Sequence, residues 1–150
     1  MDRKQFGTMA LMTAAAILIA GVAVIALQGA DTPRFTPSRA EAVRICGEIL
    51  QMRIEGKDSD ARRRALRAAL KGIPEESLTR ALLAFADADL ARVIQHEVET
   101  PFGRGLRGWA LVELGRKPEA AEELKMALAE APADWEFRGL FQSALARARQ

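Results

Sequence analysis

The sequence predicts an all-α protein in which an N-terminal transmembrane helix precedes a small domain of antiparallel helices. Three observations support this class. Residues 7–27 carry no charge, apolar residues recur at helical spacing through most of the remaining chain, and no segment combines two-residue alternation with hairpin turn residues. The length of 150 residues suits one domain with an appendage.

The N-terminal apolar run extends from Gly7 to Leu27 and follows a tail that contains Arg3 and Lys4. As a helix, this run would span about 31 Å, which matches a hydrocarbon core of about 30 Å. The alternative is a cleaved signal peptide, whose apolar region usually has about 7–15 residues. Gln28 also occupies a position where cleavage after Ala30 would require a small residue. We therefore expect an N-terminal tail over 1–6 and an uncleaved transmembrane signal anchor over 7–28.

The charges that flank the run leave its orientation open, because basic residues stand on both sides of it. A short tail with two basic residues most often stays in the cytoplasm. We therefore expect a single-pass protein of a bacterial inner membrane, with its C-terminal domain in the periplasm. The chain would contact the membrane through residues 7–27.

Residues 29–37 (GADTPRFTP) predict a linker, since two prolines and a glycine oppose regular structure. Residues 38–150 then form the helical domain. The whole chain has 22 basic and 20 acidic residues, for a formal net charge of +2. This balance excludes a dedicated nucleic-acid binder, so no nucleic-acid partner is expected.

The first four helices of the domain are predicted from caps and apolar stripes. Ser38 and Glu41 have the spacing of a capping box, Asp58 is a start signal, Pro74 suits a first helical position, and Asp87 or Asp89 restarts the pattern. The four stripes contain Ala42, Ile45, Cys46, Ile49 and Leu50; Leu66, Ala69, Leu70 and Ile73; Leu78, Ala81, Leu82 and Phe85; and Leu90, Val93, Ile94 and Val98. Pro101 is expected to close the fourth helix.

Three further helices complete about seven. One carries Leu106, Trp109, Ala110 and Leu114 and ends at Gly115; the next runs from Pro118 to Pro132; the last runs from Asp134, as its cap, to Arg149. Each apolar stripe is too narrow to be buried on all sides, so consecutive antiparallel packing is expected.

One stretch of this domain has the spacing of a helical repeat. In GWALVELGRKPEAAEELKMALAEAP, a small residue (Gly108) is followed by a turn glycine (Gly115), an acidic residue and alanine (Glu119, Ala120), a large apolar residue (Leu124), Ala-Leu (Ala127, Leu128) and a closing Pro132. This pattern resembles the tetratricopeptide repeat (TPR). The match covers residues 101–134, and it departs from the family pattern at Arg107 and Lys117. The resemblance implies that residues 38–150 form a short TPR-like helical-repeat domain, an α-solenoid.

In the tetratricopeptide family, the first helix of a repeat lines a concave groove that holds a peptide. Matching the motif position by position puts five residues in such a groove: Phe102, Gly105, Trp109, Val112 and Glu113. The resemblance implies that an exposed Trp109, flanked by Arg and Glu, anchors a bound protein segment. Packing in a core is the alternative for this tryptophan.

Two other patterns suggest sites. Residues 103–108 spell GRGLRG, which matches G-x-G-x-x-G, but Thr100-Pro101 and a helix precede it, so a flexible helix entry is expected and not a nucleotide site. Arg63, Arg67 and Lys71 form a basic stripe on one helix. That stripe is either a solvated face or a surface for an acidic protein or anionic lipid headgroups.

The remaining reactive residues do not form a constellation. Cys46 lies on an apolar face, which indicates a buried thiol, although an intermolecular bridge is the alternative outside the cytoplasm. His96 is the only histidine and has no metal ligand at suitable spacing, so a surface or boundary position is expected. We therefore expect no enzyme activity, cofactor, metal or small-molecule substrate.

These predictions combine into one functional hypothesis. The chain is expected to be a membrane-anchored protein–protein interaction module, a TPR-like scaffold or adaptor. It would assist assembly, quality control or secretion of membrane or exported proteins, which would be its partners. The alternative is a structural accessory subunit of a larger membrane complex.

Overall fold

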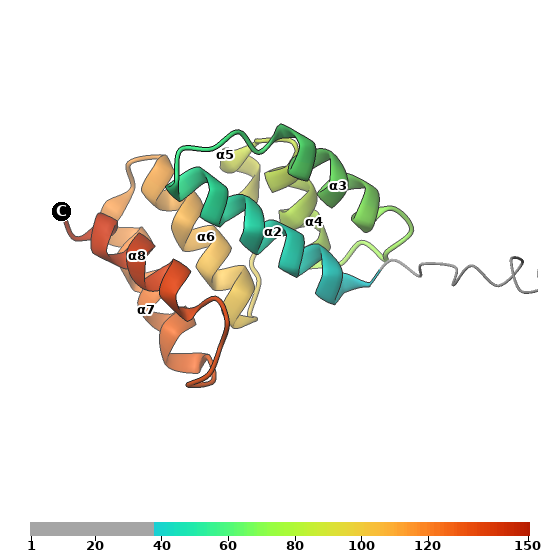
Figure 1. Ribbon diagram of the computed structural model, residues 1–150. Coiled ribbons are helices and arrows are strands. Elements are labelled where there is room, and N and C mark those ends of the chain that lie inside the picture. The colour runs from blue at the N-terminus through green and yellow to red at the C-terminus, as the bar shows by residue number, and fades with distance from the viewer. Residues whose placement is uncertain (1–37) are drawn as a thin grey trace, which may run out of the picture. The chain divides into compact units, whose positions relative to one another are not determined.

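The computed structural model describes residues 38–150, and these form an all-α domain with antiparallel helix packing (Figure 1). Its seven helices are α2 (Arg39–Ile54), α3 (Asp60–Leu70), α4 (Ser77–Ala86), α5 (Leu90–Val93), α6 (Pro101–Glu113), α7 (Lys117–Glu130) and α8 (Arg138–Ala148). The prediction of an all-α domain is thereby confirmed for these residues. The predicted tail, anchor and linker over 1–37 lie outside them. Among the helices of 38–150, none has the length and apolar character needed to cross a bilayer.

Helix α2 begins at the predicted cap, but only the serine half of the capping box forms, because the Glu41 carboxylate accepts hydrogen bonds from Arg44 instead. The side chain of Ser38 accepts a hydrogen bond from the backbone N–H of Glu41 at 3.1 Å, which satisfies one of the free donors of the first turn. The predicted stripe of α2 is buried throughout. The helix is followed by Gly56 at φ +69°, a left-handed conformation that glycine adopts without a steric penalty.

The next three helices are shorter than the apolar pattern suggests. Helix α3 starts at Asp60, two residues after Asp58, and α4 starts at Ser77 and not at Pro74. Helix α5 has only four residues, although its stripe continues to Val98. The segment after α5 still buries Val98, so the apolar residue is placed in the core by a loop.

Helix α6 begins earlier than expected, and the glycine-rich stretch lies inside it. Thr100 caps the helix through a hydrogen bond from Gly103 N–H, and Pro101 opens it instead of closing the previous one. The prediction of a flexible helix entry over 103–108 is therefore wrong. Glycine is a poor helix former, but each of these glycines lies against another side chain: Val98 at Gly103, Phe141 at Gly105 and Leu124 at Gly108. Close packing supplies the stability that local propensity lacks.

Helix α8 begins at Arg138, four residues after the predicted cap Asp134. The intervening segment packs by its aromatic side chains. Trp135 stacks on Phe141 with centroids 5.4 Å apart, and Phe137 meets Phe102 of α6 edge-on at 4.8 Å. This segment therefore fixes the direction in which α8 returns across the domain.

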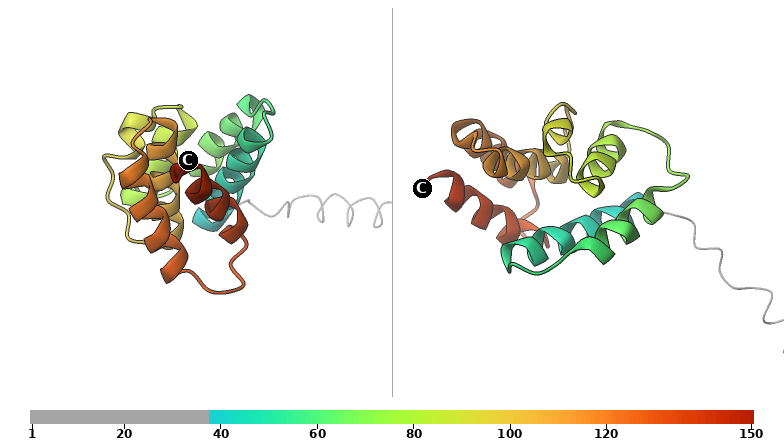
Figure 2. Two further views of the ribbon diagram at one scale, coloured as in Figure 1. Left: turned by 90° about the vertical axis from the view of Figure 1, so that its left-hand side faces the viewer. Right: turned by 90° about the horizontal axis from the view of Figure 1, so that it is seen from above.

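Within this unit the helices lie in two layers, which the right-hand view of Figure 2 shows. One layer holds α2, α3 and α8, and the other holds α4 to α7. The described part of the chain thus starts in the first layer, crosses to the second and returns with α8. Helix α8 contacts α2, α6 and α7, so the first and last described helices pack against each other. Gly47 of α2 permits this approach, because a side chain there would collide with the ring of Phe137.

Candidate functional site

The structure buries most of the groove predicted on α6. Phe102, Gly105, Trp109 and Val112 are buried, and only Glu113 is exposed. Two elements cover this face: Phe141 of α8 lies against Gly105, and Arg53 of α2 lies over Trp109. The expectation of an exposed Trp109 is therefore corrected. The concave face that the repeat pattern implies is filled by the domain's own α2 and α8.

Trp109 is a core residue with one unusual feature. Only 1% of it is exposed, and its ring meets Phe85 edge-on with centroids 5.6 Å apart. The guanidinium carbon of Arg53 lies 5.1 Å from the centre of the indole, within the range of a cation–π contact. The indole Nε1 is buried and has no hydrogen-bond partner among residues 38–150. Most buried polar atoms in proteins are paired, so this donor needs an explanation.

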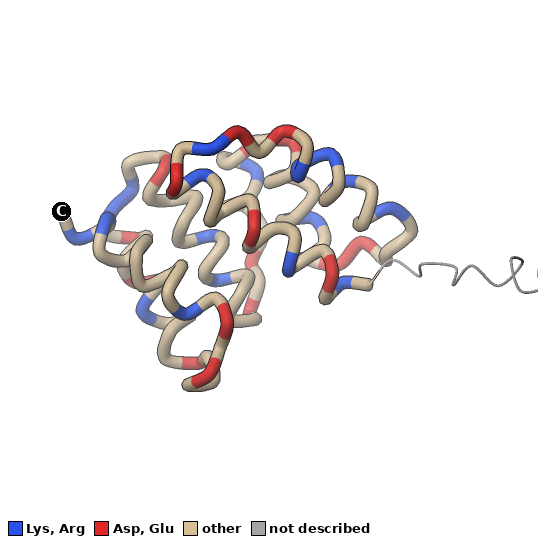
Figure 3. Tube along the Cα trace, viewed as in Figure 1, with Lys and Arg blue, Asp and Glu red and all other residues tan. Residues whose placement is uncertain are grey.

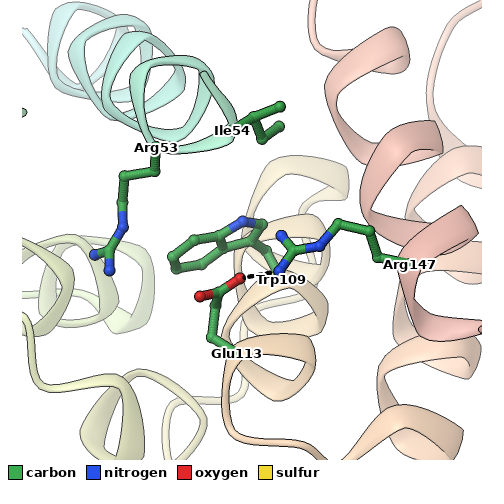
Figure 4. A pocket seen from close by; sticks show the side chains of 5 residues that line it. All are labelled: Arg53, Ile54, Trp109, Glu113 and Arg147. Carbon is green, nitrogen blue, oxygen red and sulfur yellow. Dashed lines mark hydrogen bonds and ion pairs between the residues drawn. The ribbon is translucent and has the colours of Figure 1, made fainter. Parts of the chain in front are cut away.

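A pocket of about 290 Å³ lies beside this indole, where the last turns of three helices meet. Arg53 and Ile54 end α2, Trp109 and Glu113 come from α6, and Arg147 lies in the last turn of α8. Figure 4 shows that these five side chains converge from three separate ribbons. Two members of the predicted groove, Trp109 and Glu113, thus line a real pocket, which the structure completes with residues from α2 and α8.

The positive side-chain charges of this α2–α6–α8 pocket outnumber the negative ones. Arg147 forms an ion pair with Glu113 at 2.7 Å, and both side chains are partly exposed. Arg53 forms no ion pair with any residue that the structure describes. Two guanidinium groups and one carboxylate leave one net positive side-chain charge. Basic residues at a helix C-terminus also counter the partial negative charge of the last carbonyls.

The predicted basic face on α3 is already occupied by acidic neighbours. Arg63 forms an ion pair with Asp60, and the Arg67 Nε donates to Asp87 at 3.1 Å. Lys71 is exposed at the end of α3. Figure 3 shows basic and acidic segments interspersed over the described helices. The stripe therefore resembles a solvated, internally paired surface more than an open cationic patch.

Two single residues lie where the sequence indicates. Cys46 is fully buried, and burial raises the pKa of its thiol well above the ordinary value because the thiolate loses solvation. His96 is half-buried, and its pKa is lowered by burial and by the charges of Arg92 and Arg80. Within residues 38–150, no three His, Cys, Asp or Glu side chains gather in a metal-binding arrangement.

Sequence reasoning missed Arg53, Ile54 and Arg147 as pocket residues. Arg53 and Ile54 are far from Arg147 in the chain, and an arginine in the last turn of a helix is common for reasons unrelated to ligands. Their only local signal is position, since each lies at the C-terminal end of its helix. These helix ends meet only because α8 packs beside α2, which the local sequence does not show.

The comparisons with known proteins give no match: no family model fits the chain, and no curated protein and no solved structure is significantly similar to it.

Proposed function

We propose that this chain is a membrane-anchored protein–protein interaction module. Its apolar run over 7–27 would hold it in a bacterial inner membrane, and residues 38–150 would bind a segment of a membrane or exported protein. The observation that carries the proposal is the α2–α6–α8 pocket, which combines an unpaired indole donor, a free guanidinium and the exposed apolar side chain of Ile54. Concave sites with a few convergent polar groups are the usual form of a binding site.

The packing of α6 on α7 supports the TPR-like character of the proposed module. Gly108 lies close to Leu124 and to the backbone oxygen of Ala120, and the turn between the helices uses Gly115 at φ +77°. These are positions at which the repeat requires small or flexible residues. Because α2 and α8 cover the inner face of α6, we assign the partner to the pocket at the helix ends and not to an open groove.

Site-specific photo-crosslinking in cells tests this function. A crosslinker placed at Ile54 is expected to capture a partner protein, because this pocket residue is 39% exposed. The matched control is Lys71, which is also exposed and lies near the opposite end of α2, since α2 and α3 are antiparallel. Adducts at Lys71 alone would refute the assignment to the pocket and would favour the basic face.

Purification in mild detergent separates the proposed module from an accessory subunit of a complex. A module is expected to retain its partner weakly and to exchange it, since the pocket is small. A stoichiometric and inseparable partner would instead indicate a subunit. The periplasmic location is tested by a membrane-impermeant thiol reagent: Cys46 should react in intact cells only after the domain is unfolded in place.

A further inference from the structure

The α2–α6–α8 pocket contains a donor that requires an acceptor. The indole Nε1 of Trp109 is buried and makes no hydrogen bond within residues 38–150, and a buried donor without a partner destabilises the folded state. In Figure 4 the nitrogen lies on the edge of the ring nearest to Ile54 and Arg147. The groups that close over the indole are side chains: Arg53 and Arg147 are both exposed and have rotatable stems. Trp109 is only 1% exposed, so an incoming acceptor reaches the donor only when these side chains move aside.

The charges of the pocket select an anion with a single charge. Arg53 has no acidic partner among the described residues, and Arg147 is neutralised by Glu113. The net side-chain charge of one positive unit matches one carboxylate. A doubly charged phosphate would leave an excess negative charge beside three helix C-termini, whose partial charges already oppose an anion. A charge-assisted hydrogen bond from Arg53 opposes these end effects, and a carboxylate carries half the charge of such a phosphate, so it meets less repulsion.

The size and lining of the pocket limit the rest of the ligand. A volume of about 290 Å³ is at the lower end of the range for small-molecule sites. Ile54 and the indole present apolar surface beside the charged groups. A carboxylate attached to a short apolar group therefore fits both parts of the lining.

We propose that the α2–α6–α8 pocket binds a carboxylate that carries a short apolar group, supplied either by the C-terminal residue of a protein or by a free organic acid. The guanidinium of Arg53 pairs with the carboxylate, and the Trp109 indole N–H donates to it. Ile54 contacts the apolar group. This inference rests on the proposed partner-binding function, because it names the chemistry that the same pocket recognises.

The test uses the full chain in detergent micelles, with its two tryptophans labelled with ¹⁵N. N-acetylleucine is titrated against its uncharged amide, and the indole N–H signals of Trp109 and Trp135 are followed by NMR. The Trp135→Phe variant assigns the two signals. The acid is expected to shift the Trp109 signal in a saturable manner, and the amide is expected to leave it unchanged. The Trp135 signal serves as an internal control for folding.

Variants define the role of the arginine. Arg53→Gln is expected to weaken binding of the acid at least about tenfold, which is the loss of one charge-assisted hydrogen bond. The matched control is Arg149→Gln, an exposed arginine beyond α8 that is not part of the pocket lining, and it should bind as the wild type does. Equal shifts with acid and amide, no saturable shift, or unchanged affinity in Arg53→Gln would each overturn the proposal.

A second pair of ligands identifies the source of the carboxylate. Acetyl-Ala-Ala-Leu with a free C-terminus is compared with the same peptide as its amide and with N-acetylleucine. Tighter binding of the free peptide assigns the site to a protein C-terminus, and equal affinity assigns it to a free acid; both outcomes support the carboxylate. If a partner is crosslinked at Ile54 both in the wild type and in Arg53→Gln, and the wild type does not bind the acid, this inference is overturned and the proposed function is retained. Binding of the acid with no protein crosslinked at Ile54 would instead support this inference and contradict the proposed function.

Discussion

Gly108→Ala tests whether the contact between α6 and α7 depends on a missing side chain. A Cβ at Gly108 would lie 2.6 Å from Cγ of Leu124, 3.1 Å from its Cδ2 and 3.3 Å from the backbone oxygen of Ala120. The first distance is about 1 Å shorter than an optimal contact between carbon atoms. Leu124 is fully buried, so it has little room to retreat.

The net effect follows from two opposing contributions. Overpacking a core costs about 1–3 kcal/mol, and replacing glycine by alanine inside a helix recovers about 0.5–1 kcal/mol. We expect Gly108→Ala to lower the free energy of unfolding by about 1–2 kcal/mol, which corresponds to about 4–8 °C in the thermal midpoint. The measurement is thermal and urea unfolding of the full chain in mild detergent, followed by circular dichroism.

Gly139→Ala is the matched control for this substitution. Gly139 also lies in a helix, α8, but a Cβ there meets nothing within 4 Å. This variant should be as stable as the wild type or more stable by up to about 1 kcal/mol. Adding Leu124→Ala to Gly108→Ala should cost less than the two single changes together, because the smaller side chain relieves the collision. Gly108→Ala as stable as Gly139→Ala would refute the reasoning.

Two further predictions concern Cys46 and His96. Cys46 should resist a thiol reagent in the folded protein and react at a rate that follows global unfolding, because its thiol is fully buried and its pKa is raised; rapid labelling under native conditions would contradict its position in α2. The pKa of His96 is lowered in the folded protein, so as the pH falls the unfolded chain binds a proton at a higher pH than the folded one does. The contribution of His96 to the free energy of unfolding should therefore be fully present above about pH 6.5 and decline as the pH falls toward the folded-state pKa. Urea midpoints at pH 7.5 and 5.5 measure this decline, which His96→Gln should reduce; an equal decline in both proteins would exclude the histidine as its source.

Local sequence signals determined much of the helical framework. Ser38 caps α2 as its spacing with Glu41 predicts, and the apolar stripe from Ala42 to Leu50 is buried. Gly115 forms the turn between α6 and α7 in a left-handed conformation, as a turn glycine should. These features depend on contacts within a few residues, so they are readable without the fold.

The errors lie where distant contacts outweigh local preference. The glycines of α6 predict a break, but Phe141 and Leu124 fill the space that two of them leave. Asp134 has the chemistry of a helix cap, yet the stacking of Trp135 on Phe141 delays α8 to Arg138. Local propensity is a weak prior when an aromatic side chain can be buried by tertiary packing.

The amino-acid sequence by itself determined that this domain is helical, where most of its helices run and which faces are apolar, because helix formation follows from periodicity, caps and turn residues. Only the tertiary structure decided that α8 returns beside α2, that Trp109 is buried and that Arg53, Glu113 and Arg147 share one pocket. The physical reason is that a stripe of apolar residues specifies burial but not the partner that covers it. That partner is selected by the shapes of side chains far apart in the chain, such as Gly47 against Phe137.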